Sequence, residues 1–357
     1  MQIDLVAYFY CHYMDSLTQI VLGAACGEAV LGKKIGNKAL LFGAIGGTIP
    51  DLDVFVGALL HSNEIQAMAF HRGFMHSILF SILGAFAFGW LIHKLYDKGK
   101  RLNTTSQKDW ILLFFWSLFT HPILDCFTPY GTQLFSPFSD YRVAFNTISV
   151  ADPLYTIPFL ISLIVLMFFK RTKTKRKLWL CIGVIVSSAY MTLTVFNKYY
   201  VNSVYRTSLE SNSIDFRRFQ TQPTIFNNIL WYGVAENDTE YYVGFYSLLD
   251  NKKVITDWAK IEKQHHLIPM SDEDLSTLAW FSDGYYGIRP SENSDEFIYS
   301  DLRYPLLNPD DAKTSLFTFR VFNNNGRWDL KNNRPEINED ASFSSVFGPM
   351  IERLKGK

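Results

Sequence analysis

Three short segments of the sequence combine acidic and histidine residues at the edge of a long apolar run. They are IPDLD (Ile49–Asp53), HRGFMH (His71–His76) and HPILD (His121–Asp125). Imidazole nitrogen and carboxylate oxygen together form a ligand set that suits zinc and other divalent transition metals. The residue types therefore predict a metal site, provided that the fold brings the three segments together.

The first and third segments have spacings that constrain where their side chains can point. His121 and Asp125 are four residues apart, so on a helix both side chains project from one face. Asp51 and Asp53 flank a leucine just after Pro50, where a helix is either broken or only beginning. Buried carboxylates in an apolar segment need a partner or a wet cavity. Both segments therefore indicate an internal polar site.

The second segment adds a cation to its two histidines. His71 and His76 are five residues apart, roughly 140° around a helix, so one of them is expected on a loop before the helix begins. Gly73 between them permits that bend. Arg72 could bind a phosphate through two parallel hydrogen bonds. In a later loop, Arg142 is expected either to line the substrate entrance or to be solvated.

Six ligands from three segments are enough for a two-metal site, which activates water and clamps an anionic substrate. We expect one or more divalent ions, with zinc as the metal. Arg72 would bind the anion, and a carboxylate of Asp51 or Asp53 that is not a ligand would accept the proton, so these three are the expected catalytic residues. The predicted metal ligands are Asp51, Asp53, His71, His76, His121 and Asp125.

The elements that must position these residues are six apolar runs within the first 200 residues. Several approach the roughly 20 residues needed to cross a bilayer. One such run could be a buried core helix, but six favour a membrane protein. We therefore expect an all-α membrane domain of five to six spanning helices over residues 1–200. The runs are Leu17–Leu31, Ala39–Leu60, Phe74–Leu95, Trp110–Phe127, Pro153–Phe169 and Leu178–Phe196.

Basic residues gather in alternate loops, at 33–38, 94–108 and 170–177. The positive-inside rule makes these loops cytoplasmic, with no need of a nucleic-acid partner for the last of them. The intervening loops, and everything after residue 196, are then external. All three acid-and-histidine segments fall near the external face. Each alone could be a hydrated interfacial segment, but their matching residue types favour one shared site.

The remainder of the chain differs in charge and in patterning. Residues 1–200 hold 17 Lys and Arg against 11 Asp and Glu, a net charge of +6, whereas residues 201–357 carry −6 and no long apolar run. We expect a soluble α+β domain over 201–357, with strands near 241–249 and 315–321, a strand pair within 219–236, and helices near 272–280 and 344–354. Its expected roles are to cover the site, select substrate or bind a partner, and the sequence does not rank these.

Five motifs occur in an order that resembles the YdjM-type bacterial inner-membrane proteins, described as membrane-bound metal-dependent hydrolases. The resemblance covers about residues 14–170. Its motifs are MDSLTQIVLGAACGEA, IPDLDVF, HRGFMHS, HPILDCFTPYGTQLFSPFS and VADPLYT.

The resemblance implies a helical domain in the bacterial inner membrane and metal ligation by the aspartates and histidines already named. It also implies that Asp152, in DPLYT, is a ligand or supports one. The family is more distantly similar to zinc-dependent phospholipase C and P1-type nucleases, which suggests phosphoester hydrolysis by analogy of fold.

Two polar residues near the amino terminus bear on this expectation. Family members commonly read Thr-His where this chain has Thr18-Gln19. An amide is a poor substitute for imidazole, so either one metal position is weakened or the amide oxygen of Gln19 is a weak ligand. Glu28, deep in the first run, would either relay protons or form a hydrogen bond between helices.

Three functions are consistent with these residues. The first is a membrane hydrolase that acts on a small-molecule or lipid phosphoester at the outer face of the inner membrane. The second is a metal-binding transporter, which would need polar residues through the whole membrane, whereas here they stop near one face. The third is a membrane scaffold or regulator without catalysis, which Gln19 favours. The expected surroundings are the lipid bilayer and a substrate, with no nucleic acid.

Overall fold

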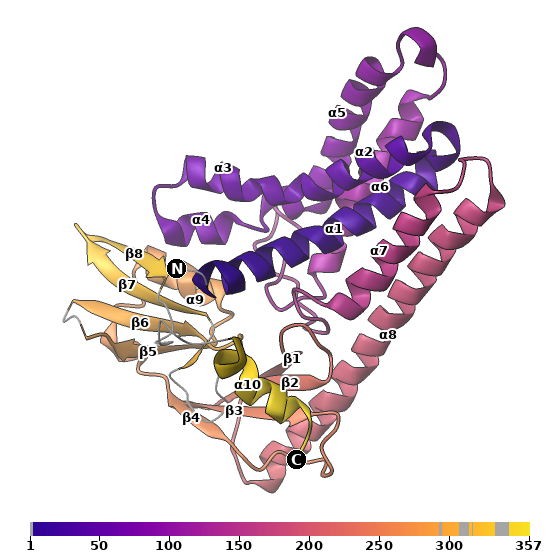
Figure 1. The fold of residues 1–357 in the computed structure, drawn as a ribbon. Coiled ribbons are helices and arrows are strands. Elements are labelled where there is room, and N and C mark those ends of the chain that lie inside the picture. The colour runs from indigo at the N-terminus through magenta and orange to yellow at the C-terminus, as the bar shows by residue number, and fades with distance from the viewer. Residues whose placement is uncertain (1–2, 293–294, 307–313, 316, 333–342) are drawn as a thin grey trace. The chain divides into compact units, whose positions relative to one another are not determined.

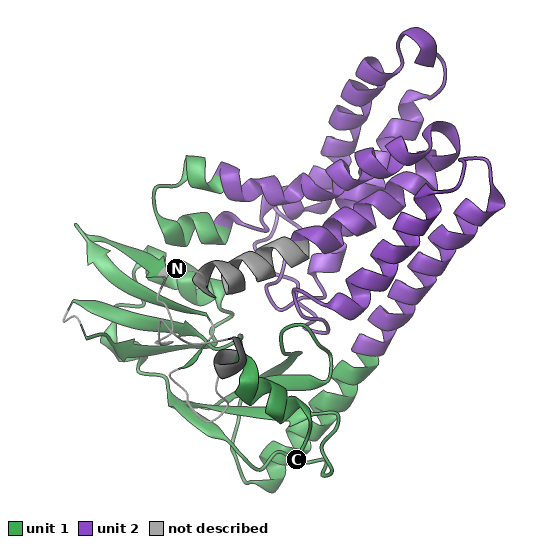
Figure 2. Cartoon of the chain, in the orientation of Figure 1, with its two compact units in different colours: residues 1–5, 57–69, 195–357 green, residues 6–56, 70–194 purple. Residues whose placement is uncertain are grey.

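The computed structural model describes the chain apart from residues 1–2, 293–294, 307–313, 316 and 333–342, and it leaves out the side chains of residues 3–15, 332 and 343–346 (Figure 1). The described residues form two compact units (Figure 2). We call residues 6–56 and 70–194 the helical unit, and residues 1–5, 57–69 and 195–357 the C-terminal unit. The predicted domain boundary at residue 200 falls inside one long helix, α8.

The helical unit consists of α-helices joined by short 3-10 turns. Ser106 begins α6 with a capping box, in which its side chain and that of Asp109 each bind the other residue's backbone N–H. The elements are α1 (Ile3–Ile35), α2 (Asn37–Thr48), η1 (Pro50–Leu52), α3 (Asp53–Leu60), η2 (Phe74–His76), α5 (Ile78–Tyr96), η3 (Gly99–Arg101), α6 (Gln107–Asp125), α7 (Pro153–Met167) and the first part of α8 (Thr174–Ser211).

Helices α1 and α2 touch through their backbones. A Cβ atom added to Gly43 would lie 2.2 Å from the Gly23 carbonyl oxygen, and one added to Gly47 would lie 2.5 Å from the Gln19 carbonyl oxygen. Such contacts need small residues spaced four apart on both helices, as in helix pairs within membranes. The close approach brings the end of α2 beside Gln19 of α1.

Helices α5 and α6 are joined by a hydrogen bond that a proline makes available. Pro122 lies inside α6 and has no N–H to bind the Leu118 carbonyl four residues earlier. The Ser81 hydroxyl on α5 lies 3.2 Å from that carbonyl and 3.0 Å from the Ser77 carbonyl, so the two carbonyls share its proton. Trp110 and Leu118 of α6 are fully buried in the core between these helices. Pro122 therefore helps to fix the end of α6 that carries His121.

The expected count of five to six membrane spans is not supported. Among the described residues, two helices, α5 and α8, are long and apolar enough to cross a membrane, or three spans if α2 and Pro50–Leu60, bent by 43°, are counted as one. Helix α7 has 15 residues and so extends only about 22 Å, short of the roughly 30 Å bilayer core. Helix α6 has 19 residues but carries polar residues at both ends.

The C-terminal unit contains two antiparallel four-stranded sheets, in the orders β1-β2-β3-β4 and β5-β6-β7-β8. This confirms the expected α+β character, including the strand pair within 219–236. The elements are the end of α8, then β1 (Arg218–Pro223), β2 (Leu230–Glu236), β3 (Glu240–Ser247), β4 (Ala259–Glu262), η4 (His265–Leu267), α9 (Glu273–Phe281), β5 (Tyr286–Pro290), β6 (Glu296–Asp301), β7 (Thr318–Asn324), β8 (Arg327–Asn332) and α10 (Phe343–Leu354).

The C-terminal unit also includes residues 57–69, a segment between two of the acid-and-histidine motifs. Helix α4 (Glu64–Phe70) lies in this segment, and its Ile65 is fully buried in the core cluster of the second sheet. The Asn63 side chain accepts from the backbone N–H of Ile65 and donates to the Trp328 carbonyl at 2.7 Å. Gln66 donates to Asp274 at 3.0 Å. Segment 57–69 is therefore held by β8 and α9.

Candidate metal centre

Asp51, His76 and His121, one from each predicted motif, come together in the helical unit. The two imidazole Nε2 atoms are 3.1 Å apart. Asp51 Oδ1 lies 3.4 Å from Nε2 of His76 and 3.3 Å from Nε2 of His121. These three residues form a cluster that could hold a metal ion, and we call them the metal trio.

The spacing of the metal trio matches the spacing of ligands around zinc. Tetrahedral zinc has bonds of about 2.0–2.1 Å to histidine nitrogen and similar bonds to carboxylate oxygen, which places neighbouring ligand atoms about 3.3 Å apart. The three separations in the metal trio are 3.1, 3.3 and 3.4 Å. The donor atoms are therefore already at the distances that one ion requires.

His121 is oriented by a backbone carbonyl. Its Nδ1 is 2.6 Å from the Gly47 oxygen, and because a carbonyl can only accept, Nδ1 must carry the proton. In the neutral ring, Nε2 then has a lone pair directed toward the metal trio. A second hydrogen bond of this kind commonly fixes the tautomer of histidines that bind metals. The Gly47 carbonyl was not singled out from the sequence, since a backbone atom carries no residue-type signal.

His76 is placed by the start of α5. It is the last residue of η2, and the next residue, Ser77, caps α5 by accepting from the Phe80 N–H at 3.0 Å. The imidazole of His76 is fully buried, with Nε2 in the metal trio and Nδ1 3.0 Å from Asp53 Oδ2. Asp51 reaches the same point from η1, at the bend between α2 and α3.

Asp53 and His71 lie beside the metal trio. Asp53 Oδ1 is 2.7 Å from His71 Nδ1, and Oδ2 accepts from the Arg72 backbone N–H at 2.9 Å while also approaching His76. Both carboxylate oxygens are thus engaged by the second motif, which indicates support of His76 more than direct ligation. Burial lowers the pKa of His71, and its hydrogen bond with Asp53 offsets only part of this effect.

Asp125 lies against the metal trio from the other end of the HPILD motif. Its Oδ2 is 3.5 Å from Nε2 of His76 and 3.4 Å from Nε2 of His121. Its Oδ1 accepts from Gln19 Nε2 at 2.7 Å and lies 3.6 Å from Arg72 Nη2. Asp125 therefore presents one oxygen to the metal trio, and its other oxygen faces a neutral donor and a cation.

Gln19 donates hydrogen bonds from its amide nitrogen to two residues of the HPILD motif. Besides Asp125, Nε2 reaches the His121 carbonyl at 3.2 Å. Its Oε1 is buried and has no hydrogen-bond partner among the residues that the structure describes. With the nitrogen end toward the metal trio, Gln19 is placed to support Asp125.

The charges around the metal trio favour a divalent cation. Three carboxylates, those of Asp51, Asp53 and Asp125, surround two imidazoles, and the nearby cation is the buried guanidinium of Arg72. With neutral imidazoles, two negative charges remain, which is the charge that one divalent ion balances. Buried charges without such compensation are costly. Donor spacing and charge thus both fit a metal ion.

Two arginines meet at one aromatic ring. The guanidinium carbons of Arg72 and Arg142 each lie 4.9 Å from the centre of the Tyr130 ring. Arg72 has a positive φ of 59° and donates to the Thr128 hydroxyl at 2.9 Å, and Arg142 donates to the Gly131 carbonyl at 3.1 Å. The family-like motif contained Thr128 and Tyr130, but their types alone gave no signal for this arrangement.

Two further predicted residues are engaged elsewhere in the helical unit. Asp152 caps α7 by accepting from the N–H groups of Leu154 and Tyr155, and its other oxygen accepts from the Tyr190 hydroxyl at 2.8 Å. Glu28 forms a buried two-point ion pair with Arg176, both contacts being 2.6 Å. The interpretation of Glu28 as a link between helices is therefore confirmed.

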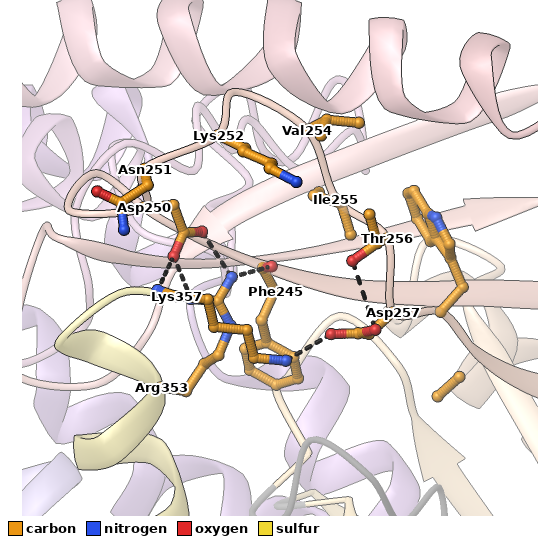
Figure 3. Close-up of a pocket in the computed structure, with 12 residues that line it drawn as sticks. Phe245, Asp250, Asn251, Lys252, Val254, Ile255, Thr256, Asp257, Arg353 and Lys357 are labelled. Atoms are coloured by element: carbon orange, nitrogen blue, oxygen red, sulfur yellow. Dashed lines mark hydrogen bonds and ion pairs between the residues drawn. The ribbon is translucent and has the colours of Figure 1, made fainter.

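The C-terminal unit contains a cavity of about 630 Å³ between the 250–259 loop and α10 (Figure 3). Arg353 binds both oxygens of Asp250 at 2.6 Å and donates to the Phe245 carbonyl at 2.8 Å. Burial alone would raise the pKa of Asp250, but the hydrogen bonds from Arg353 and from backbone N–H groups lower it overall. Arg353 and Lys357 are both paired with aspartates, and none of the predicted site residues lines this cavity.

Comparison with known proteins finds a family whose matched region contains the site. The model of the YdjM inner membrane protein family matches residues 14–201, a range that includes every predicted site residue. The uncharacterized protein YfhP of Bacillus subtilis (strain 168) is 30% identical over 150 residues, which are 39% of this chain and 42% of that protein. The chain therefore matches less than half the length of this relative. No solved structure matches the chain.

Proposed function

We propose, from the premise that the chain belongs to the YdjM inner membrane protein family, that the protein is a membrane-bound, metal-dependent hydrolase of phosphoesters. The observation that carries the proposal is the metal trio, with donor atoms 3.1–3.4 Å apart among side chains of net negative charge. A bound divalent ion would supply Lewis-acid activation of water and of the phosphoryl group.

The residues of the chain divide the remaining work. Asp51, His76 and His121 would hold the ion, and Asp53 and the Gly47 carbonyl would orient the two imidazoles. Asp125 Oδ2 faces the metal trio and is placed to take the proton that the attacking water loses. Gln19 and Arg72 at Oδ1 keep that carboxylate in position.

A phosphoester is favoured over a neutral substrate because the guanidinium of Arg72 lies beside Asp125 and shares the Tyr130 ring with a second guanidinium, that of Arg142. Arg72 is buried and partly neutralised by Asp125, whereas Arg142 is half-buried on the same Tyr130 ring. Guanidinium groups match the geometry of phosphate oxygens. In this proposal Arg142 meets the anion first, and Arg72 supplies the positive potential behind it.

The proposed location of the site is the outer face of the inner membrane. Helix α5 begins two residues after His76 and ends in a basic stretch with Lys94, Lys98 and Arg101. By the positive-inside rule, the basic end is cytoplasmic, so the His76 end faces outward. The C-terminal unit is then extracytoplasmic.

Elemental analysis of the detergent-purified chain, prepared without chelator, tests the proposal, followed by a phosphoesterase assay with the recovered metal. We expect His121→Ala and Asp51→Ala to lose bound metal and turnover together, because each removes one donor of the metal trio. His93→Ala, a histidine at the other end of α5, is the matched control and should keep both. Full metal content in the His76→Ala, His121→Ala double variant would defeat the proposal.

A further inference from the structure

The loop that follows α6 contains a short hairpin beside the metal centre. Thr132 and Val143 exchange backbone hydrogen bonds of 3.1 and 2.9 Å and so close the segment between them. We call residues 132–143 the hairpin. Gln133 donates its N–H to the Arg72 carbonyl at 3.0 Å, which attaches the hairpin to the second metal-binding motif.

The hairpin exposes three aromatic side chains within seven residues. Phe138 is 85% exposed, Tyr141 66% and Phe135 50%. Single exposed apolar residues are common on protein surfaces, but a contiguous exposed group marks a surface that contacts something apolar. We call Phe135, Phe138 and Tyr141 the aromatic tip.

A backbone hydrogen bond fixes where the hairpin lies relative to a membrane span. The Ile78 N–H donates to the Leu134 carbonyl at 3.0 Å, and Ile78 is the first residue of α5. Helix α5 has 19 residues, about 28 Å, which corresponds to the apolar core of a bilayer. The hairpin is therefore attached at the level where a spanning helix leaves that core, and aromatic side chains are enriched at this level in membrane proteins.

The lipid-facing surface of α5 continues toward the hairpin. Ile82, Leu83 and Phe86, in the first half of α5, are exposed, as is Phe74 just before the helix. This row of apolar side chains leads along α5 to Ile78, where the Leu134 carbonyl is bound. A bilayer that covers α5 therefore extends to the aromatic tip.

We infer that the aromatic tip inserts into the interfacial layer of the bilayer, and that the site draws its substrate from that layer as the phosphate-bearing headgroup of a lipid. The aromatic tip contacts lipid because Leu134, where the hairpin is attached to α5, lies at the end of a span. The apolar surface of the aromatic tip also continues that of α5. The identity of the substrate rests on the proposed function, but insertion of the aromatic tip does not.

Nitroxide labelling of the full chain in phosphatidylethanolamine and phosphatidylglycerol vesicles tests insertion. The label is attached to Phe138→Cys in a chain whose exposed Cys181 is replaced by serine, and the background signal is subtracted. This label should collide more often with oxygen than with a water-soluble nickel chelate. The control, Leu249→Cys, is 55% exposed in the C-terminal unit and should show the reverse. A Phe138 label with the control's profile, or one shielded from both reagents by protein, would overturn the inference.

A two-substrate assay tests the source of the phosphoester. We expect the triple variant Phe135→Ser, Phe138→Ser, Tyr141→Ser to lose most turnover of a vesicle-borne phospholipid, and to keep turnover of a short-chain soluble analogue with the same headgroup. Unchanged metal content would show that the variant folds. Equal losses of turnover on both substrates in the triple variant would overturn a lipid as the source of the phosphoester. So would a wild-type chain that hydrolyses only the soluble analogue. If the wild-type chain hydrolyses neither substrate, the proposed function and the lipid source fail, whereas insertion stands on the labelling result.

Discussion

At the scale of single residues, Asp53 is a residue that we expect to support a metal ligand without binding the metal itself. Its two oxygens bind His71, the Arg72 backbone and His76, so it fixes the second motif as one unit. Outer partners of this kind orient a ligand histidine and raise its basicity. The same logic applies to the Gly47 carbonyl and His121.

We predict that Asp53→Asn weakens metal binding about 10–100-fold without abolishing it, because the amide supports His76 less well than a carboxylate. Asp51→Asn should lose the metal more completely, since it alters a donor. Competition titration with a chromophoric chelator measures both. Asp152→Asn, which alters a helix cap in the same unit, is the control and should bind like wild type. Equal affinities for Asp53→Asn and wild type would contradict the assignment.

The site residues show what spacing can and cannot predict. The i, i+4 spacing of His121 and Asp125 correctly predicts that their side chains lie next to each other, because helix geometry is regular. The orientations of His71 and Asp53 depend on a loop in which Arg72 has a φ of 59°. Loop conformation of that kind is set by distant contacts, and so the sequence did not separate these two residues from the metal trio.

At the scale of elements, the backbone contact between α1 and α2 positions both Gln19 and the Gly47 carbonyl. We predict that Gly43→Ala lowers the free energy of unfolding by about 1–3 kcal/mol, the range for overpacking, because its Cβ would meet the Gly23 oxygen. Metal content should fall as well, since the Gly47 carbonyl would move from His121.

Thermal unfolding in detergent and elemental analysis measure the two effects. The control is Gly348→Ala in α10, where an added Cβ has no atom within 4 Å, and it should be neutral or stabilising. A Gly43→Ala variant as stable as this control would show that α1 and α2 can separate without cost.

The end of α10 and the turn after β3 are connected by the Asp250–Arg353 pair, and this predicts a pH dependence. Because the pKa of Asp250 is lower in the folded chain, its contribution to stability is present above the unfolded value of about 3.9 and is lost as the pH falls through the folded pKa. Protection against hydrogen exchange across residues 243–257, measured relative to the intrinsic exchange rate at each pH, should therefore fall in acid.

Asp257 also has a lowered pKa, mainly because Lys357 donates to it, so the comparison must isolate Asp250. We expect Asp250→Asn to be less protected at neutral pH and to lose less protection on acidification than wild type. Equal acid sensitivity in the two proteins would assign the effect to other groups.

Elements were predictable from sequence where a local pattern decides them. Aromatic content indicated the β1–β2 pair, and a β-leaning stretch bounded by turn residues indicated the region of β3, because strand pairing there is between neighbours in sequence. The expected number of spans is not supported, because an apolar run does not report helix length or bends. The run Ala39–Leu60 contains Pro50, where the helix that follows is bent by 43° from α2, and α7 is shorter than its run.

At the scale of the whole molecule, segment 57–69 connects two ligand motifs and packs in the C-terminal unit. Asp51 precedes the segment and His76 follows it. We predict that loosening this segment weakens metal binding although no ligand is altered. Asn63→Asp keeps the acceptor that caps α4 but removes the donor to the Trp328 carbonyl. A lost buried hydrogen bond should lower the free energy of unfolding by about 1–3 kcal/mol.

Metal affinity by chelator competition is the decisive measurement for this variant. Asn323→Asp is the matched control, because the Asn323 side chain accepts from the Gly326 N–H in the β7–β8 turn and keeps that role as a carboxylate. Metal affinity in Asn63→Asp equal to that of the control would show that the C-terminal unit and the metal centre are independent. Packing between residues so far apart in sequence leaves no local pattern, so it could not be predicted.

The bond from Asn63 to Trp328 also has a consequence for biosynthesis. The two residues are 265 positions apart, so at about 5–20 residues per second Asn63 is synthesised roughly 13–53 seconds before Trp328. During that interval Ile65 has no second sheet to cover it. The acid-and-histidine motifs on either side are complete early, yet the segment that spaces them is secured only when translation reaches β8. The spacing of these two motifs is thus secured only after β8 has been synthesised.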